Sequence, residues 1–357
     1  MDKIRLIHVG LGRWGFDWAR DVLPGHPDVE AVAYVDGDGA ALRRAQKELG
    51  APPDACFADI ATALRRVASD AVVVCLPTAF HAPVARLALE ADRHVVVEKP
   101  FTATMREAHD LVGLAEARRR VLMVSQNYRY FPASVAAAEF VRKGDFGKLC
   151  QIKIDFRRNA VVEGHGYLGL ANPLLVDMAV HHFDLMRMII GEDPAELSCR
   201  TWNPRGSPFT GDACGAIVLT FPSGVAVSYR GSWLDQGAQT AWAGEWQMDF
   251  EHGSVLWTSR GSGPEGPARD RVATKRPNAE AETRALPAMR LYGRRGVLAA
   301  FATAIRTGRE PVHFPSGRSN IATLAVIEAA LESSALAGTS VRIADVLATE
   351  NSAKPID

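Results

Sequence analysis

The chain has 357 residues, more than one hydrophobic core usually holds, so its length predicts two domains. Hydrophobic residues make up 47% of it and charged residues 23%, a composition typical of globular proteins. Its 41 basic residues balance 41 acidic ones, which argues against nucleic acid or a membrane surface as a partner, and no apolar run approaches the roughly 20 residues of a membrane span.

The first predicted strand, Ile4–Val9, runs into a glycine-rich turn with Gly10, Gly12 and Gly15, and a helix is predicted over Phe16–Leu23. A strand, a tight turn and a helix N-terminus are the context that gives the G-x-G-x-x-G pattern its meaning. Gly10 permits the turn, Gly12 leaves the backbone bare for a pyrophosphate, and Gly15 lets the helix pack closely on the strand. Because a helix N-terminus offers N–H groups and a partial positive charge to phosphates, we expect a dinucleotide site here.

The second predicted strand, Ala31–Val35, ends in Asp36, about 20 residues after the glycines. A carboxylate there accepts hydrogen bonds from the adenosine ribose hydroxyls and repels a 2′-phosphate, which favours NAD over NADP as the cofactor. The alternative interpretation is a turn aspartate before Gly37. Arg43 and Arg44, one or two helical turns further on, could instead serve a 2′-phosphate.

Strands and helices alternate through the rest of the first third, which predicts a parallel doubly wound sheet, a Rossmann domain of residues 1–125. Further helices are predicted at Gly39–Leu49, Ile60–Val67, His81–Glu90 and Met105–Arg118, and further strands at Ala71–Leu76, Val95–Val97 and Val121–Val124. Ligands of such sheets bind at the carboxyl ends of the strands. The residues that follow the strands are therefore candidates for contact with the cofactor: Pro77, Thr78, Glu98, Lys99, Pro100, Gln126 and Asn127.

From about Cys150, strand-like segments follow one another with few helices, which predicts an α/β domain of residues 126–357 with a mixed or antiparallel sheet. The predicted strands are Gln151–Phe156, Leu197–Trp202, Ala213–Phe221, Val225–Trp233, Thr240–Phe250 and Ser254–Trp257. The predicted helices are Leu174–Ile190, closed by Gly191, and Gly296–Arg306 and Asn320–Leu336. The polar segment Gly261–Ala288 is interpreted as a long surface loop that could include one edge strand.

Glu98-Lys99-Pro100 follows the strand at the predicted cofactor edge. A lysine ammonium there could hydrogen-bond a substrate hydroxyl and lower its pKa, and Pro100 would fix the backbone so that Lys99 points inward. The alternative is an ordinary surface lysine at the end of a strand.

The helix predicted at Leu174–Ile190 carries a second candidate cluster. At 3.6 residues per turn, Asp177, His181 and Asp184 share one face, while His182 points away. A carboxylate one turn from a histidine can hold its ring and support its positive charge, which suits a general base near neutral pH. The alternative is a buried core histidine with an ordinary capping acid. No metal site is expected, because the Asp-x-x-x-His pair lacks a convincing third ligand nearby.

Several loop residues are expected to contact a substrate. His165, Tyr167 and Asn172 precede the Asp177 helix, and Arg129 follows Tyr128 after the last strand of the first domain. The tryptophans of the second domain could stack on a sugar face, but sheet packing is their commoner role in a strand-rich domain. They are Trp202, Trp233, Trp242, Trp246 and Trp257.

The cysteines are five in number, Cys56, Cys75, Cys150, Cys199 and Cys214, with no C-x-x-C spacing. The odd count and the spacing favour free, mostly buried thiols in a reducing cytoplasm. No secretion signal precedes the first strand, so a cytoplasmic location is expected.

With these motifs the chain resembles the Gfo/Idh/MocA family of NAD(P)-dependent oxidoreductases, which includes glucose–fructose oxidoreductase and inositol dehydrogenase. The resemblance covers nearly the whole length of the chain. The motifs that carry it are the Gly10 to Gly15 turn, Asp36, Pro77-Thr78 with His81, Glu98-Lys99-Pro100, Asn127-Tyr128-Arg129, the helix with Asp177, His181 and Asp184, and Phe301–Arg306. It implies a Rossmann domain followed by an α/β domain with a large open, mainly antiparallel sheet, through which we expect a homodimer or homotetramer. Ala179 stands where relatives often have a glycine, a departure that bears on substrate fit.

The resemblance implies that Lys99, Asp177 and His181 form the catalytic set. The preferred hypothesis is NAD-dependent oxidation of a secondary alcohol of a sugar, inositol or related polyol. His181 would take the hydroxyl proton, Lys99 would polarise the oxygen and Asp177 would orient the pair; which of Lys99 and His181 is the formal base stays open. Two alternatives are a glycoside-processing enzyme that uses NAD transiently without net oxidation, and a non-catalytic NAD(P)- or sugar-sensing regulator.

The expected contacts follow from these motifs. Those with the cofactor are Gly10, Gly12, Arg13, Trp14, Gly15, Asp36, Pro77, Thr78, His81, Glu98, Lys99 and Gln126. Those with the substrate are Lys99, Tyr128, Arg129, His165, Tyr167, Asn172, Asp177 and His181.

Overall fold

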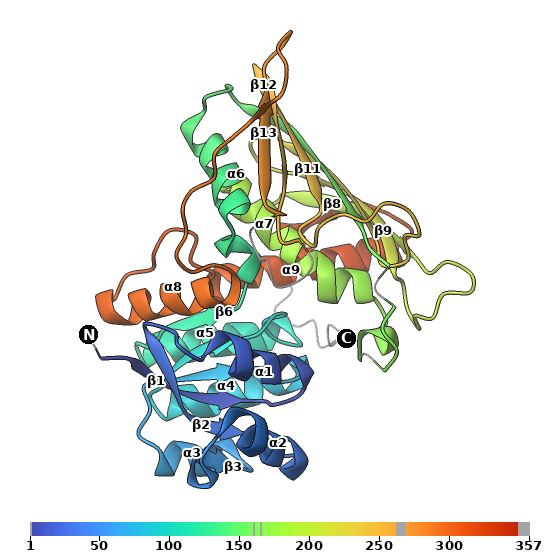
Figure 1. Ribbon diagram of the computed structural model, residues 1–357. Helices are drawn as coiled ribbons and strands as arrows, with labels where there is room; N and C mark the ends of the chain where they lie inside the picture. Colours follow the sequence, from blue (N-terminus) through green and yellow to red (C-terminus); the bar gives the residue numbers. More distant parts are fainter. Residues whose placement is uncertain (1, 160, 165, 262–268, 349–357) are drawn as a thin grey trace. The chain divides into compact units, whose positions relative to one another are not determined.

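The computed structural model describes residues 2–159, 161–164, 166–261 and 269–348. In these ranges the chain forms two compact units (Figure 1), one of residues 2–126 with 294–321 and one of residues 127–293 with 322–348. The sequence predicts two consecutive domains. It does not predict that residues 294–321 return to the first unit. None of the helices within the described ranges is long and apolar enough to cross a membrane.

The first unit is built on a six-stranded parallel sheet in the order β3-β2-β1-β4-β5-β6, which confirms the predicted Rossmann sheet. Its strands are β1 (Ile4–Val9), β2 (Val29–Val35), β3 (Cys56–Phe57), β4 (Ala71–Val74), β5 (His94–Val97) and β6 (Leu122–Val124). The valines of β4 and β5 are fully buried, as expected of a parallel sheet covered on both faces. The strand order reverses between β1 and β4, the switch point at which such sheets bind their ligands.

Side-chain caps explain where several helices of this unit begin. The Asp38 carboxylate accepts a hydrogen bond from the Ala40 N–H at 2.8 Å, and Thr104 forms a reciprocal capping box with Glu107. The helices are α1 (Arg13–Asp17), η1 (Trp18–Val22), α2 (Gly39–Leu49), α3 (Ile60–Arg66), α4 (His81–Glu90), α5 (Met105–Ala117), α8 (Gly293–Thr307) and the start of α9 (Gly317–Ala335). The helix after the glycine turn thus starts three residues before the predicted Phe16 and continues as a π-helical turn.

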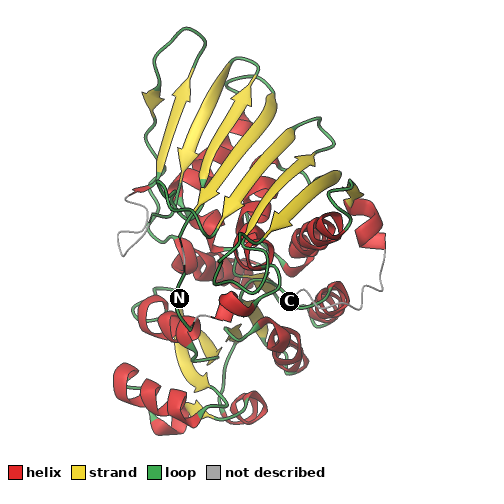
Figure 2. Cartoon of the chain, turned by 90° about the vertical axis from the view of Figure 1, so that its right-hand side faces the viewer, coloured by secondary structure: helices red, strands yellow, loops and turns green. Residues whose placement is uncertain are grey.

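The second unit is built on a nine-stranded sheet in the order β14-β13-β12-β11-β7-β10-β9-β8-β15 (Figure 2, yellow). Among its described strands only β7 and β10 pair in parallel, so the predicted mainly antiparallel sheet is confirmed. Its strands are β7 (Leu149–Arg157), β8 (Glu196–Trp202), β9 (Cys214–Thr220), β10 (Ala226–Ser232), β11 (Glu245–Phe250), β12 (Gly253–Thr258), β13 (Arg271–Lys275), β14 (Glu282–Thr283) and β15 (Val341–Arg342).

Several elements of the second unit differ from the sequence prediction. Helix α6 (Pro132–Lys143) was not predicted, although Pro132 at its first position and a left-handed Gly144 at its end are ordinary helix signals. The segment interpreted as a loop holds two strands, β13 and the edge strand β14, and part of it lies outside the described residues.

The helix that carries the Asp177 cluster changes its winding along its length. Residues Leu174–Ala179 form a π-helical segment, η6, and Val180–Ile190 form the regular helix α7, which ends at a left-handed Gly191 as predicted. Asp177 therefore lies in a wider turn than the 3.6-residue period assumed for it, while His181, His182 and Asp184 keep regular helical spacing.

Two fully buried histidines tie neighbouring elements together. His8 of β1 donates from Nε2 to the Gly15 carbonyl at 2.9 Å, across the glycine turn. His182 of α7 donates from Nε2 to the Trp242 carbonyl at 3.1 Å and accepts at Nδ1 from the Tyr229 hydroxyl at 3.1 Å. Because burial disfavours the charged ring, the pKa of each falls from 6.5 to about 4.

We predict that acid destabilises the protein through these two rings. Between pH 6.5 and about 4, His8 and His182 become protonated in the unfolded chain but stay neutral in the folded protein. The free energy of unfolding therefore falls as the pH falls. The slope per histidine is at most about 1.4 kcal/mol per pH unit. Urea unfolding across this range should show a shallower slope for His182→Asn, whereas His109→Gln, at an exposed position of α5, should keep the wild-type slope. An unchanged slope in His182→Asn would contradict this account.

Candidate active site

Each of the three glycines of the first turn occupies its position for a different structural reason. Gly10 has a φ of +97°, and a Cβ there would lie 2.2 Å from the Cys75 carbonyl oxygen. A Cβ at Gly15 would lie 2.1 Å from the Gly10 carbonyl oxygen, so strand and helix touch at this point. A Cβ at Gly12 would meet no atom within 4 Å. The backbone at Gly12 is therefore open at the start of α1, and the turn fits the pyrophosphate of a dinucleotide.

The Asp36 carboxylate fastens this turn to the end of β2. One oxygen accepts the Leu11 N–H at 2.6 Å and the other accepts the Asp38 N–H at 2.8 Å. Each carboxylate oxygen has a second lone pair for a ribose hydroxyl, so the turn role and the cofactor role are compatible. Arg44 lies with its guanidinium carbon 3.4 Å from the centre of the Phe16 ring, where it stacks on the helix that follows the glycines.

The residues after β4 and β5 are linked to each other by side chains. His81, 1% exposed, has Nδ1 2.9 Å from the Pro100 carbonyl oxygen and Nε2 2.8 Å from the Leu76 carbonyl oxygen. Glu98, 5% exposed, accepts hydrogen bonds from Trp18 Nε1 at 2.9 Å and from the Lys99 N–H at 3.1 Å. His81 and Glu98 thus shape the edge from which the half-buried Lys99 extends. Their contact with a cofactor stays a prediction.

The other predicted cofactor residues of this unit differ in accessibility. Trp14 is 40% exposed, and the guanidinium carbon of Arg294 lies 4.3 Å from its ring centre. Gln126 is buried and donates from Nε2 to Asn320 Oδ1 at 3.1 Å. Arg13 and Pro77 are exposed, and Thr78 is half-buried.

In the second unit, two consecutive residues hold helix α7. Tyr128, in the short helix η4 (Asn127–Tyr130), stacks on His181 with ring centres 4.0 Å apart and planes 4° apart. Arg129 forms two hydrogen bonds of 2.6 Å with the Asp184 carboxylate, and both side chains are almost fully buried. His181 and Asp184 therefore face the same element, as their predicted shared helix face requires, while His182 is directed to Tyr229.

The ion pair gives Arg129 a structural partner that the sequence did not indicate. Burial by itself would lower the pKa of Arg129, but the adjacent Asp184 carboxylate raises it, so the guanidinium stays charged. Because two of its nitrogens are bound to Asp184, we interpret Arg129 first as a residue that positions η4 on α7. Its contact with a substrate stays a prediction.

The predicted substrate residues before α7 do not form one group. The buried Tyr167 stacks between Phe209 and Trp233, with ring centres 5.9 and 5.3 Å away. Asn172 and Asp177 are half-buried, and His165 lies outside the described residues. Three of the tryptophans, Trp233, Trp246 and Trp257, are buried in sheet packing.

Sequence reasoning missed two arginines beside Tyr128. Arg260 donates from Nη1 to the Tyr128 hydroxyl at 2.7 Å, and Arg158 and Arg260 both lie against the Trp242 ring. No spacing pattern could have joined them, because they are about 100 residues apart and follow the ends of different strands, β7 and β12. Within the described ranges, no group of three or more His, Cys, Asp or Glu side chains is arranged to hold a metal ion.

Two family models match the chain in sequence order. The oxidoreductase family with an NAD-binding Rossmann fold (GFO_IDH_MocA) matches residues 4–126, and the GFO/IDH/MocA C-terminal domain matches residues 134–256. The chain belongs to the Gfo/Idh/MocA family. It is thus an NAD(P)-dependent oxidoreductase whose Rossmann domain binds NAD.

Individual relatives of this family member act on sugars. The chain is 29% identical to the D-apiose dehydrogenase of Paraburkholderia graminis, over 84% of this chain and 80% of that protein. It is 27% identical to the dTDP-3,4-didehydro-2,6-dideoxy-alpha-D-glucose 3-reductase of Streptomyces violaceoruber, over 92% and 94% of the two chains. An inositol dehydrogenase homologue from Azotobacter vinelandii, solved with NADH and myo-inositol, has a TM-score of 0.82 at 20% identity, covering 96% of this chain and 98% of that one. At this identity the last comparison shows the shared fold alone.

We predict that Asp36 makes this family member prefer NAD. A hydrogen bond from a ribose hydroxyl to a charged acceptor contributes about 1.5–3 kcal/mol, and NADP would place a phosphate against the carboxylate instead. The expected ratio of dissociation constants is about tenfold to several hundredfold in favour of NAD. Calorimetric titration of both cofactors checks this.

The controls separate the cofactor role of Asp36 from its role in the turn. Asp36→Asn keeps an acceptor oxygen for the Leu11 N–H but loses the charge, so it should bind NADP better than the wild type does. Asp38→Ala removes a helix cap two residues away and should leave the ratio unchanged. Equal binding of both cofactors by the wild type would show that Asp36 is a turn residue only.

Proposed function

We propose that this protein oxidises a secondary alcohol of a sugar, inositol or related polyol with NAD as the hydride acceptor. The observation that carries the proposal is His181, which is held flat against Tyr128 on a helix whose next turn is fixed by the Arg129–Asp184 ion pair. A ring fixed in this way is suited to exchange one proton with a substrate hydroxyl. The dehydrogenase and reductase names of the relatives support this substrate class.

The proposed roles of the side chains follow from their chemistry. When NAD is bound, it supplies the acceptor for the hydride that leaves the carbinol carbon of the substrate. His181 takes the hydroxyl proton, and the Lys99 ammonium donates a hydrogen bond to the same oxygen, so that negative charge on it is stabilised. Asp177, one turn before His181, orients the reacting pair by accepting hydrogen bonds.

We expect His181→Ala and Lys99→Ala each to lower kcat by about a hundredfold to ten-thousandfold, the usual contribution of a general acid or base. The NAD dissociation constant should change little, because neither side chain holds the phosphates. Steady-state rates of NADH formation, with NAD titration of each variant, measure both effects. Lys143→Ala, which removes a surface lysine of α6, serves as the control. Full turnover in either active-site variant would remove that residue from the mechanism.

The same assay separates the alternative functions. Glycoside cleavage without net NADH would indicate transient use of NAD. Tight NAD binding with no turnover of any sugar, inositol or glycoside would indicate a regulator.

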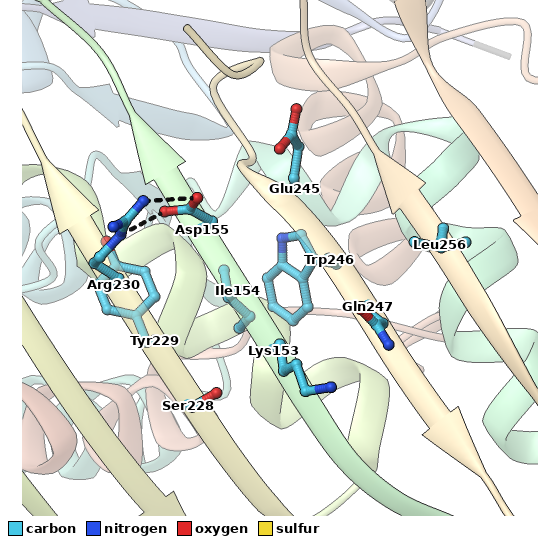
Figure 3. Close-up of a pocket in the computed structure, with 10 residues that line it drawn as sticks. All are labelled: Lys153, Ile154, Asp155, Ser228, Tyr229, Arg230, Glu245, Trp246, Gln247 and Leu256. Carbon is cyan, nitrogen blue, oxygen red and sulfur yellow. Dashed lines mark hydrogen bonds and ion pairs between the residues drawn. The ribbon is translucent and has the colours of Figure 1, made fainter. Parts of the chain in front are cut away.

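We propose further that two copies of the chain associate through the outward face of the second-unit sheet. A hollow of about 380 Å³ on this face is lined by side chains of β7, β10, β11 and β12 (Figure 3). Acidic and basic groups are paired in and beside the hollow, Arg230 with Asp155 and Arg157 with Glu245. Leu256 and Val218 add exposed apolar surface. A face with balanced charges and apolar positions is complementary to a second copy of itself.

We expect Leu256→Glu combined with Val218→Glu to convert the oligomer into monomers, because two new charges would be buried in the contact. Sedimentation velocity measures the change. Leu87→Glu, at a similarly exposed position of α4, is the matched control and should keep the wild-type assembly. A wild-type protein that sediments as a monomer, or a double variant that sediments like the wild type, would contradict the proposed contact.

A further inference from the structure

A cavity of about 300 Å³ lies in the first unit at the amino-terminal ends of β5 and β6. His94, the first residue of β5, and Leu122, the first residue of β6, belong to its wall. The rest of the wall comes from the end of α5, the end of α8 and the start of α9, with the turns beside them. Ligands of a doubly wound sheet bind at the carboxyl ends of its strands, so this cavity is separate from the expected cofactor edge. Its volume is at the lower end of the range for small-molecule sites.

Positive groups outnumber negative groups among the described residues of this wall. The charged side chains that line it are four arginines and two glutamates: Arg119, Arg120, Arg309, Arg318, Glu116 and Glu310. Arg318 is paired, because its Nε and Nη2 both donate to Glu116 Oε1. Burial raises the pKa of the Glu310 carboxyl, which is also hydrogen-bonded to the Ser316 side chain. The wall therefore has an excess of positive charge.

The three other arginines are only weakly compensated by carboxylates. The ion-pair partner of the half-buried Arg120 is Asp92, whose Oδ1 lies 4.0 Å from Arg120 Nε. Arg118 shares the same oxygen, at 3.5 Å from its Nη1, and both distances exceed the length of a hydrogen bond. Arg120 Nε is buried and has no hydrogen-bond partner in the part of the chain that the structure describes. Among the same residues, the exposed Arg119 and Arg309 form no ion pair with a carboxylate.

His94 adds a neutral donor to the wall. Its Nδ1 accepts the Val121 N–H at 2.9 Å, so the ring proton is on Nε2, which forms no hydrogen bond within the described ranges. Burial and the positive charge of Arg120 lower the pKa of His94 to about 4, against the opposite effect of Asp70. The charge of Arg120 therefore acts on the wall of the cavity, and the ring of His94 is neutral near pH 7.

We propose that this cavity binds a small molecule through an oxyanion, a phosphate or a carboxylate group, at a site separate from the cofactor edge. Guanidinium groups match the oxygens of either anion, and the His94 N–H supplies a further donor. A bound anion would also relieve the repulsion among the arginines. The apolar residues of the wall offer contact to the carbon part of the ligand: Val112, Ala115, Leu122, Ala304 and Ile305.

Calorimetric titration of the NAD-loaded protein with sodium phosphate and with sodium succinate, at constant ionic strength, tests this site. Saturating NAD occupies the glycine turn, which would otherwise compete for phosphate. We expect one of the two anions to bind with a Kd of about 1 mM or lower, and the two arms decide which group the cavity takes. Absence of binding by both anions up to about 10 mM would overturn the proposal.

Variants locate the bound anion. Arg120→Met should raise its Kd about tenfold, the effect of one charge-assisted hydrogen bond, and Arg309→Met at an exposed position should raise it about twofold to fivefold. Glu310→Gln removes a negative charge from the wall and should lower the Kd about twofold to fivefold. Arg66→Met is the matched control, because Arg66 is an exposed arginine of α3 outside the cavity, and it should keep the wild-type Kd.

Thermal unfolding without anion shows whether each variant folds. If Arg120→Met does not fold, Arg309→Met and Glu310→Gln decide the outcome. A Kd that none of the cavity variants changes, or one that Arg66→Met raises as much as they do, would overturn the proposal. No turnover is measured, so the result is independent of the proposed dehydrogenase function.

Discussion

The buried ion pair between Arg129 and Asp184 is the interaction on which the candidate chemistry of the second unit depends. Both charges have left water and lie against each other, so loss of one partner costs about 3–5 kcal/mol. Arg187, one turn after Asp184, donates to Thr323 Oγ1 at 2.8 Å and joins α9 to the same network. The pair therefore fixes η4 against α7 in a single register. That register decides where Tyr128, the residue before Arg129, meets His181.

In the first unit, close backbone contacts constrain the glycine turn. Gly10 and Gly15 allow no larger residue, because strand, turn and helix backbones touch there. Asp36 then ties the Leu11 N–H to the end of β2, and His8 ties the Gly15 carbonyl to β1. The backbone at Gly12 stays open in the middle of these contacts. These bonds hold the turn that we expect to bind the phosphates, so little conformational entropy would be lost there when a dinucleotide binds.

The chemistry of the second unit depends on which face of the sheet a residue reaches. Arg157 is the last residue of β7 and Arg158 follows it, and the two side chains have different partners. Arg157 meets carboxylates on the outward face, whereas Arg158 meets Trp242 and the positive charge of Arg260. One residue type therefore meets carboxylates at one position and an aromatic ring at the next.

Much of the first unit was determined by the sequence alone, because its signals are local. The strand Ile4–Val9 and the helices Gly39–Leu49 and His81–Glu90 have the predicted bounds, since a buried strand, a cap and a turn each act within a few residues. Helix α6 carried local signals as well and was overlooked. Only the tertiary structure decided that Arg129 pairs with Asp184, that Tyr128 stacks on His181, and that Arg158 meets Arg260. These partners are about 50 to 100 residues apart, and their contact depends on strand order, helix winding and register, which no local pattern in the sequence encodes.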